Sequence, residues 1–378
     1  MKKCVVVSDS FKGTVSSREI CEIAQRVIPR HFPSCEVVCI PVADGGEGTV
    51  DCFIQAMGAQ RVEVTVTNAL GEKSAAAYAR IGELAIIEMA AAAGLPQVGA
   101  LRCPGTATTY GVGELIAHAA HSGCKRILLG LGGSATNDGG CGCAAALGVG
   151  FLDADGQSFV PVGDTLGRIA RIDTAKADEL LRSVEITVMC DVTNPLYGPT
   201  GAAYVFAPQK GADAEKVKSL DAGLRHFGDV IRSQLGIDVS RMLGAGAAGG
   251  MGAGCVALLG GTIRSGIDAV LDVTGFDRQL EGADLVITGE GRIDSQSAGG
   301  KVISGVARRT KAKGIPLIAI AGGIADSAGA VYDIGVSAMF STDRAALPVD
   351  MLGARSPGDY EATLSDIMSL IAIAERFA

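Results

Sequence analysis

Residues 130–140 (G-L-G-G-S-A-T-N-D-G-G) form the stretch whose residue types best suit phosphate binding. They follow a short apolar run and precede a tract of small residues, a pattern that predicts a strand, a loop and a helix. The glycines let a ligand approach the backbone, and the helix start offers free N–H groups and a positive dipole end. An ordinary tight turn is the alternative, although two glycine pairs exceed what a turn needs. The residues expected to contact a phosphate-bearing cofactor are Gly132, Gly133, Ser134, Thr136, Asn137, Asp138 and Gly139.

Polar loops also follow two predicted strands near the start of the chain, at residues 3–7 and 36–42. Because ligands of parallel α/β sheets bind at the carboxyl ends of the strands, side chains from both loops are expected to line one cleft. Capping of a loop or a helix is the structural alternative for the aspartates. The polar residues of the two loops are Asp9, Ser10, Lys12, Asp44 and Glu47.

Two further carboxylates follow strands predicted later in the chain. Asp191 comes after the strand at residues 184–189, in C-D-V-T-N-P-L-Y-G-P-T-G, where two prolines stiffen the loop. Asp294 comes after the strand at residues 285–287, in T-G-E-G-R-I-D, which also contains Arg292. A stiff loop holds a side chain in one place, so Asp191 is the better positioned of the two carboxylates.

Together, these loops supply the residue types that phosphoryl transfer requires. N–H groups with a Lys or Arg hold phosphates, carboxylates hold Mg²⁺, and one carboxylate accepts the proton of the attacking hydroxyl. The chain lacks a Walker A motif, because residues 299–301 (G-G-K) precede Val302 rather than Ser or Thr.

A nicotinamide-dependent oxidoreductase is the alternative from another reaction class. Gly130, Gly132 and Ala135 satisfy G-x-G-x-x-A, and Asp153 lies about twenty residues further on, where a ribose-binding acid would stand. No His lies in a predicted strand-end loop to serve hydride transfer, which counts against this alternative. A second match, G-x-G-x-x-G within residues 244–254, has no strand before it, and these residues are predicted to form a flexible or substrate-facing loop and the entry to a close-packed helix.

The composition is that of a globular protein, and 378 residues are enough for two domains. A net charge of −8, 4% aromatic residues and no Trp disfavour nucleic acid and anionic membranes as partners. The 11 cysteines lack a disulfide or zinc spacing, and no segment has the length of a signal peptide or a membrane helix. A reduced, cytoplasmic protein with a small-molecule substrate is therefore expected.

The order of the predicted elements indicates two α/β domains. Strand–loop–helix units recur near both ends of the chain, whereas an antiparallel meander opens at residue 61. Residues 1–66 and 282–378 are predicted to form a doubly wound, flavodoxin- or Rossmann-like domain with a parallel sheet. Residues 67–281 are predicted to form an inserted α/β domain with a mixed sheet, which carries the glycine-rich loop. The active site is expected in the cleft between the domains.

Five motifs, in the same order, resemble those of the bacterial glycerate kinase family. They are D-S-F-K-G, P-V-A-D-G-G-E-G-T, G-L-G-G-S-A-T-N-D-G-G, C-D-V-T-N-P-L-Y-G and T-G-E-G-R-I-D, and the resemblance covers essentially the whole chain. It implies ATP-dependent phosphorylation of D-glycerate, with Mg²⁺, most simply at the 2-hydroxyl to give 2-phosphoglycerate. It also implies two α/β domains with an active site between them. Phosphorylation of the 3-hydroxyl, or of another small hydroxy acid, stays open because no motif specifies it.

Residue roles follow as hypotheses from this reaction. The glycine-rich loop would hold the ATP phosphates. Asp191 is the first choice for the general base and Asp294 the second. Whichever of the two is not the base, or Asp44, would hold Mg²⁺, and Asp191 and Asp44 are the named metal candidates. Lys12 and Arg292 would clamp the glycerate carboxylate or the γ-phosphate, and both count as catalytic candidates. The residues expected to contact the substrate are Ser10, Lys12, Asp44 and Arg292.

Overall fold

The chain folds into two compact units, each built from helices and strands. Unit 1 consists of Met1–Ala43 and Ile267–Ala378, and unit 2 is Asp44–Gly266. The predicted class, two α/β domains with one inserted into the other, is confirmed. The structure, a computed structural model, describes residues 1–11, 14–40, 42, 48–299, 302–345, 353 and 355–377.

Both junctions between the units lie earlier in the chain than the boundaries 66/67 and 281/282 expected from the sequence. The strand β3 (Gln60–Thr67) pairs along its length with β4 (Lys73–Ile81), which places it in unit 2. The helices α11 (Gly266–Val273) and α12 (Phe276–Gln279) are tied to unit 1, because Arg309 forms ion pairs with aspartates of both.

Unit 1 contains a sheet of five parallel strands in the order β13–β12–β11–β1–β2. The strand order reverses between β1 and β11, which makes the carboxyl ends of these two strands the topological switch point of the sheet. The predicted doubly wound parallel sheet is therefore present. The strands are β1 (Lys3–Ser8), β2 (Glu36–Cys39), β11 (Leu285–Ile293), β12 (Leu317–Ile324) and β13 (Ala338–Ser341).

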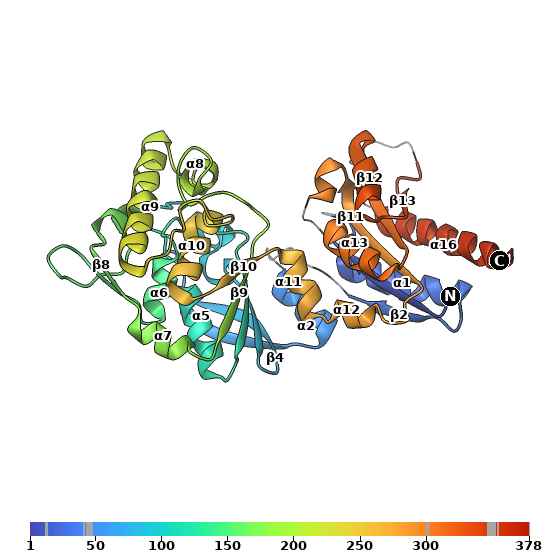
Figure 1. Ribbon diagram of the computed structural model, residues 1–378, viewed down its shortest axis with the longest axis horizontal. Helices are drawn as coiled ribbons and strands as arrows, with labels where there is room; N and C mark the ends of the chain where they lie inside the picture. Colours follow the sequence, from blue (N-terminus) through green and yellow to red (C-terminus); the bar gives the residue numbers. More distant parts are fainter. Residues whose placement is uncertain are drawn as a thin grey trace. The chain divides into compact units, whose positions relative to one another are not determined.

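Helices from the two ends of the chain lie side by side in unit 1 (Figure 1). α1 (Ser17–His31) starts at a capping box formed by Ser16 and Glu19, and α16 (Ser356–Ala374) carries Glu361, which pairs with two arginines of α1. Together they cover one face of the sheet. The strand side chains of the opposite parity, such as Val5 and Val286, are also buried, as expected for a sheet covered on both faces. The remaining helices are η3 (Ser295–Ala298), α13 (Val302–Lys313), η4 (Asp326–Gly329) and α14 (Ala330–Ile334).

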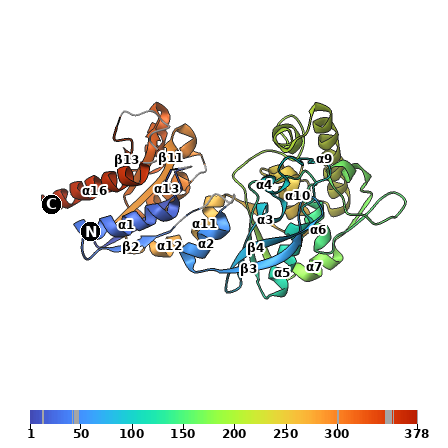
Figure 2. The same cartoon turned by 180° about the vertical axis from the view of Figure 1, so that it is seen from behind.

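Unit 2 contains a mixed sheet of six strands in the order β10–β9–β6–β5–β4–β3. The first four strands are parallel, and β4 and β3 continue the sheet in antiparallel fashion (Figure 2), so the predicted meander is confirmed. The carboxyl ends of the four parallel strands therefore share one edge. The strands not yet given are β5 (Leu84–Glu88), β6 (Arg126–Gly130), β9 (Glu185–Met189) and β10 (Thr262–Arg264), with β7 (Gly150–Leu152) and β8 (Arg171–Asp173) in a separate two-stranded sheet.

Three helices of unit 2 follow, contain or contact the glycine-rich segments. α6 (Cys141–Ala146) follows the loop after β6, and α10 (Ala247–Leu259) contains the second glycine-rich segment. α9 (Ala214–Leu235) begins after Asp213, which caps it by accepting from the Lys216 N–H at 2.8 Å. The others are α2 (Thr49–Met57), α3 (Ala90–Ala93), α4 (Leu95–Val98), α5 (Tyr110–His121), η1 (Gly163–Arg168), α7 (Ala175–Leu181), α8 (Ala202–Phe206) and η2 (Pro208–Lys210).

Throughout the described residues, each helix is either too short or too polar to cross a lipid bilayer.

Candidate functional site

The glycine-rich loop connects β6 to α6, in the strand–loop–helix order that the sequence predicts. The backbone of this loop is in close contact with glycines of residues 244–254. A Cβ atom on Gly249 would lie 2.1 Å from the Thr136 carbonyl oxygen, and one on Gly254 would lie 2.2 Å from the Gly139 carbonyl oxygen. The Gly139 N–H also donates to the Gly249 carbonyl at 3.0 Å. The loop and residues 244–254 therefore pack directly on each other.

The second glycine-rich segment is thus not the flexible or substrate-facing loop that its sequence suggests. Gly249 and Gly250 are buried, and the backbone of Ala248, Gly249 and Gly250 is left-handed, with φ of +52°, +70° and +91°. Glycine is needed where a backbone adopts positive φ and meets another backbone. The partner at this position is the 136–140 backbone, which explains the composition without a ligand.

The polar side chains of the loop face inward. Ser134 is 6% exposed, and Thr136, Asn137 and Asp138 are fully buried. The Asp138 carboxylate accepts hydrogen bonds from the Thr109 N–H and hydroxyl, both at 2.8 Å, and from the N–H groups of Gly140 and Gly142 at 3.1 and 3.3 Å. Burial raises the pKa of the Asp138 carboxyl, while these hydrogen bonds act to lower it. Asp138 is accordingly an internal brace of the loop.

Three polar atoms of the loop are buried and have no hydrogen-bond partner anywhere in the described chain. They are Thr136 Oγ1 and the Oδ1 and Nδ2 atoms of Asn137. A buried polar atom without a partner costs about 1–3 kcal/mol, so native proteins retain few of them, and those retained often mark function or bound solvent. Both residues belong to the predicted phosphate-contacting set.

Lys210 lies beneath the same loop, 2% exposed, at the end of η2. Its Nζ donates to Ser134 Oγ and to the Thr136 carbonyl oxygen, each at 2.7 Å. Burial lowers the pKa of Lys210 to about 7, although the negative charge of Asp138 acts to raise it. Lys210 was not among the predicted site residues, because nothing in its local sequence, A-P-Q-K-G, indicates that the side chain is buried.

Asp191 and Glu88 lie at the same edge of the unit 2 sheet as the glycine-rich loop. Asp191 follows β9, and Glu88 is the last residue of β5. These two strands flank β6 in the sheet. Asp191 is exposed, and its Oδ1 accepts from the Gly266 N–H at 2.8 Å. Glu88 is buried and accepts from the Val50 N–H at 2.5 Å. Glu88 was not among the predicted site residues, although the rule used for the other carboxylates, an acid at a strand end, also applies to it.

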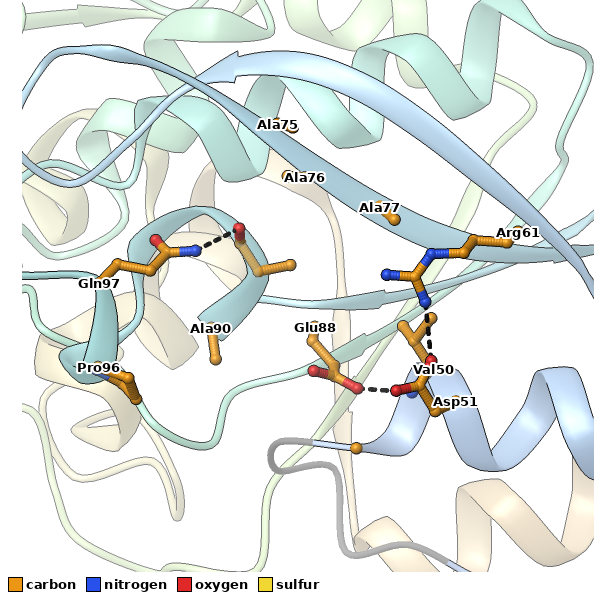
Figure 3. Close-up of a pocket in the computed structure, with 12 residues that line it drawn as sticks. Val50, Asp51, Arg61, Ala75, Ala76, Ala77, Glu88, Ala90, Pro96 and Gln97 are labelled. Atoms are coloured by element: carbon orange, nitrogen blue, oxygen red, sulfur yellow. Dashed lines mark hydrogen bonds and ion pairs between the residues drawn. The ribbon is translucent and has the colours of Figure 1, made fainter.

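A cavity of about 300 Å³ opens beside Glu88 in unit 2 (Figure 3). Arg61 and Asp51, which form an ion pair at 2.8 Å, lie on one side, and Gln97 lies on the other. Alanines of β4 and α3 make up much of the remaining wall. The volume suits a molecule of a few heavy atoms, and the charged groups suit a polar one.

In unit 1, the predicted residues of the first loop lie at the switch point of the sheet. Asp9 donates its N–H to the Gly289 carbonyl of β11 at 2.9 Å, which joins the ends of β1 and β11. Its Oδ1 accepts from the Ser10 N–H at 2.7 Å, in a local turn. Both side chains are half-buried. Ser10 therefore occupies the position at which open parallel sheets bind ligands.

Asp294 and Arg292 follow on from the same edge of the unit 1 sheet. Asp294 is half-buried and caps η3, since its Oδ1 accepts from the Gln296 N–H at 2.8 Å. Arg292 is exposed, and it forms no ion pair with any described residue. Glu290, between the strand core and Arg292, is 7% exposed. The described part of unit 1 thus holds Ser10, Arg292 and Asp294, whereas unit 2 holds the loop and Asp191.

Two predicted residues, Lys12 and Asp44, lie outside the described residues, as does Glu47. Within the ranges that the structure describes, no three His, Cys, Asp or Glu side chains group together in a way that could hold a metal ion. The described donors therefore do not by themselves make a magnesium site, and the predicted ligand set cannot be completed from them.

The geometry of Asp153 contradicts the nicotinamide-binding alternative. A dinucleotide fold needs the strand after the glycine-rich turn and helix to lie beside the first strand, in parallel. The strand after α6 is β7, which instead pairs with β8 in a separate antiparallel sheet. Asp153 stabilises a turn after β7, where it accepts from the Gln157 N–H at 2.9 Å and pairs with Arg168. It is not placed to bind a ribose.

The chain is similar to glycerate kinases over nearly its full length. The glycerate kinase family model matches residues 4–372. A glycerate kinase of Bacillus cereus is 46% identical over 377 residues, which cover 99% of each chain. A glycerate 2-kinase of Escherichia coli K12 is 45% identical over 343 residues, which cover 90% of each chain. A crystal structure from Salmonella typhimurium LT2, provisionally assigned as glycerate kinase 2, matches with a TM-score of 0.88, 39% identity and 99% coverage of each chain.

Proposed function

We propose that this chain, which belongs to the glycerate kinase family and is therefore a kinase, transfers the γ-phosphoryl group of ATP to the 2-hydroxyl of D-glycerate. The products would be ADP and 2-phosphoglycerate. The observation that carries the proposal is the similarity to glycerate kinases along the whole chain, and the relative named glycerate 2-kinase favours the 2-hydroxyl over the 3-hydroxyl. A cytoplasmic location, expected from the sequence, stays a prediction.

The chemistry of the glycine-rich loop supports ATP as the phosphoryl donor. A hydroxyl and an amide of the loop, at Thr136 and Asn137, have no hydrogen-bond partner among the described residues, and a buried ammonium group lies beneath the loop, at Lys210. Hydroxyls, amides and a nearby positive charge are the groups that bind phosphate oxygens. Gly132 is half-buried and Gly133 is exposed, so part of the loop is open to solvent. The role of this loop is to bind and orient the phosphates.

Asp191 remains the first choice for the general base, with Asp294 second. Each carboxylate also has a local structural role, Asp191 as acceptor for the Gly266 N–H and Asp294 as the cap of η3. Asparagine keeps an acceptor oxygen for either hydrogen bond but cannot take up the proton of the attacking hydroxyl. Asp191→Asn should therefore lower kcat by about 10²–10⁴-fold while the protein stays folded. A normal kcat in Asp191→Asn, with a large loss in Asp294→Asn, would reverse the assignment.

Arg292 is the described cation best suited to the substrate carboxylate. It is exposed at the carboxyl end of β11, and its guanidinium can form two parallel hydrogen bonds to a carboxylate. Arg292→Lys keeps the charge but loses this geometry. The expected result is a higher KM for glycerate at an unchanged KM for ATP, measured by steady-state kinetics. A change in the KM for ATP alone would place Arg292 at the γ-phosphate.

Mg²⁺ is part of the proposal because phosphoryl transfer from ATP generally uses it to neutralise the phosphate charge. The described carboxylates do not form a metal cluster, so Asp191 is at most one ligand of a set that includes undescribed residues or the phosphates themselves. What the chain itself contributes is to bind the phosphates, orient the hydroxyl and accept its proton.

The experiment that tests the proposal is an ADP-release assay with Mg-ATP and D-glycerate, with the product identified by phosphorus NMR. Release of ADP with 2-phosphoglycerate as the product is the expected result. Formation of 3-phosphoglycerate would contradict the regiochemistry, and ADP release with a different hydroxy acid would contradict the substrate. No ADP release with D-glycerate or other hydroxy acids would refute the proposed reaction.

A further inference from the structure

We propose that Lys210 is a positioning residue of the phosphate-binding loop, whose buried ammonium group orients Ser134 so that its hydroxyl donates to an anionic oxygen bound there. The inference rests on the proposed function, since it takes the anion to be a phosphate of ATP. Lys210 lies far from this loop in the sequence, but its Nζ is 2.7 Å from both Ser134 Oγ and the Thr136 carbonyl oxygen.

The donor–acceptor chemistry fixes the direction of the Ser134 hydroxyl. In its charged ammonium form, which a bound anion favours, Lys210 can only donate, so Ser134 Oγ then accepts from Lys210. The hydroxyl proton of Ser134 is then left to donate elsewhere, and it has no acceptor in the part of the chain that the structure describes. A hydroxyl that accepts from a cation is also a stronger donor, because hydrogen bonds in a chain polarise one another. Ser134 is thus prepared to meet an acceptor such as a phosphate oxygen.

The position of Ser134 makes that acceptor a ligand. Ser134 keeps 6% of its surface exposed, and its neighbour Gly133 is exposed. On the inner side, the loop is filled by protein, with Gly249 against Thr136 and Phe227 within 3 Å of the Cβ position of Gly139. Residues 93–95 also pair with the loop, since the Leu95 N–H donates to the Gly133 carbonyl and the Ala135 N–H donates to the Ala93 carbonyl, each at 2.8 Å. A ligand would therefore reach Ser134 through the small exposed surface that it keeps beside Gly133.

The charge of Lys210 also favours an anion at this place. An ammonium group taken out of water is costly unless a negative charge lies against it. Among the described residues, Lys210 has no ion pair. The titratable groups around it are Asp138, whose carboxylate is already engaged with Thr109 and two backbone N–H groups, and Arg102, which donates to the Gln209 carbonyl beside it. A bound phosphate would supply the missing negative charge.

This arrangement predicts that the wild-type protein takes up a proton when it binds nucleotide. Burial lowers the pKa of Lys210 to about 7, and an anion bound close by would raise it again. At pH 7.5, binding of a non-hydrolysable Mg-ATP analogue should therefore be accompanied by uptake of up to about three-quarters of a proton. Titration calorimetry in two buffers with different ionisation enthalpies measures this uptake. The analogue itself is fully ionised as its magnesium complex, and Lys210→Met should abolish the uptake.

Kinetics of three variants test the route through Ser134. Lys210→Met and Ser134→Ala should each raise the KM for ATP by about tenfold or more, with a much smaller effect on the KM for glycerate. The KM for ATP of the double variant should not exceed that of the more impaired single variant, since both substitutions remove the same donor. Lys218→Met is the matched control, because Lys218 on α9 is exposed and, among the described residues, its ion pair is with Glu215. It should behave as the wild type.

Three results would overturn the inference: no proton uptake by the wild type, additive effects in the double variant, or an unchanged KM for ATP in Lys210→Met. The uptake measurement needs no variant, so it decides the question even if Lys210→Met fails to fold. Failure of the proposed function would look different, because the wild type would then release no ADP with D-glycerate. Wild-type turnover with normal ATP kinetics in Lys210→Met would refute the role of Lys210 alone.

Discussion

Replacing Lys210 by Met should change how the free energy of unfolding depends on pH. In the unfolded chain, the Lys210 side chain has its ordinary pKa of 10.5, whereas burial lowers it to about 7 in the folded protein. Between these two values, the unfolded chain binds a proton that the folded protein does not. Raising the pH through this range therefore stabilises the folded wild type, and the stabilisation is lost as the pH falls through 7.

The magnitude follows from the two pKa values. Each pH unit between them contributes about 1.4 kcal/mol, and integration from pH 7 to pH 8.5 gives about 1.6 kcal/mol. Lys210→Met lacks this contribution. From pH 7 to pH 8.5, the free energy of unfolding of the variant should thus rise by about 1.6 kcal/mol less than that of the wild type. Other titrating groups, including the buried thiols, are shared by the two proteins and cancel in the difference.

Urea unfolding followed by circular dichroism at pH 7.0, 7.75 and 8.5 measures this difference, with the slope m compared to check that the same transition is followed. Lys218→Met, in which an exposed Lys is replaced, should parallel the wild type at every pH. Equal pH dependence in the wild type and Lys210→Met would show that Lys210 does not titrate as a buried group. A wild type that loses stability relative to the variant as the pH rises would refute the reasoning by its sign.

Three further substitutions test the packing within each unit. Gly249→Ala should lower the stability by about 3 kcal/mol or more, because it combines positive φ with a Cβ 2.1 Å from a carbonyl oxygen, whereas Gly282→Ala, at φ +71° with open space around it, should cost only about 1 kcal/mol in urea unfolding. Arg309→Met should lower the stability by about 1–2 kcal/mol, since three aspartates of α11 and α12 lose their ion pair with Arg309, although Asp268 keeps Arg308, while Arg18→Met, which breaks one exposed pair, should cost less than about 0.5 kcal/mol in the same assay. Thr109→Val should cost about 1–3 kcal/mol by thermal unfolding, because the buried Asp138 loses one donor and the Cys143 N–H loses its acceptor; a change below 0.5 kcal/mol would show that Asp138 does not need this brace.

Local patterns were sufficient to predict the strands before four of the candidate site loops, but not the short strands β7, β8 and β10. The strand predicted at residues 285–287 continues to Ile293, so most of the predicted loop T-G-E-G-R-I-D is strand. The apolar runs before Asp9, Gly130, Asp191 and Asp294 all form strands, because a short hydrophobic run ended by glycine or a polar residue is a local signal. The parallel arrangement then places each loop at a carboxyl end. The same rule would have found Glu88, at the end of a predicted strand, had it been applied to every acidic residue.

Contacts between distant segments could not be predicted in this way. A glycine is needed wherever a backbone approaches closely, whether the approaching group is a ligand or another part of the chain. Residues 130–140 pack against residues 244–254, and neither sequence indicates that the other segment is its packing partner. Lys210 is a similar case, since lysine is almost always exposed and only its contacts with Ser134 and Thr136 reveal why this one is not.

The filled inner side of the loop nevertheless strengthens the case for phosphate binding at its outer side. Catalysis of phosphoryl transfer relies on donors that are already fixed in place before the ligand arrives. Gly249 holds the loop through Thr136 and Gly139, and Lys210 holds it through Ser134, so the loop has little room to rearrange. A loop that was free on both sides would have to be ordered by the ligand, at an entropic cost to binding. The close packing of two glycine-rich segments thus accounts for a rigid donor set, although the glycines themselves contact protein rather than phosphate.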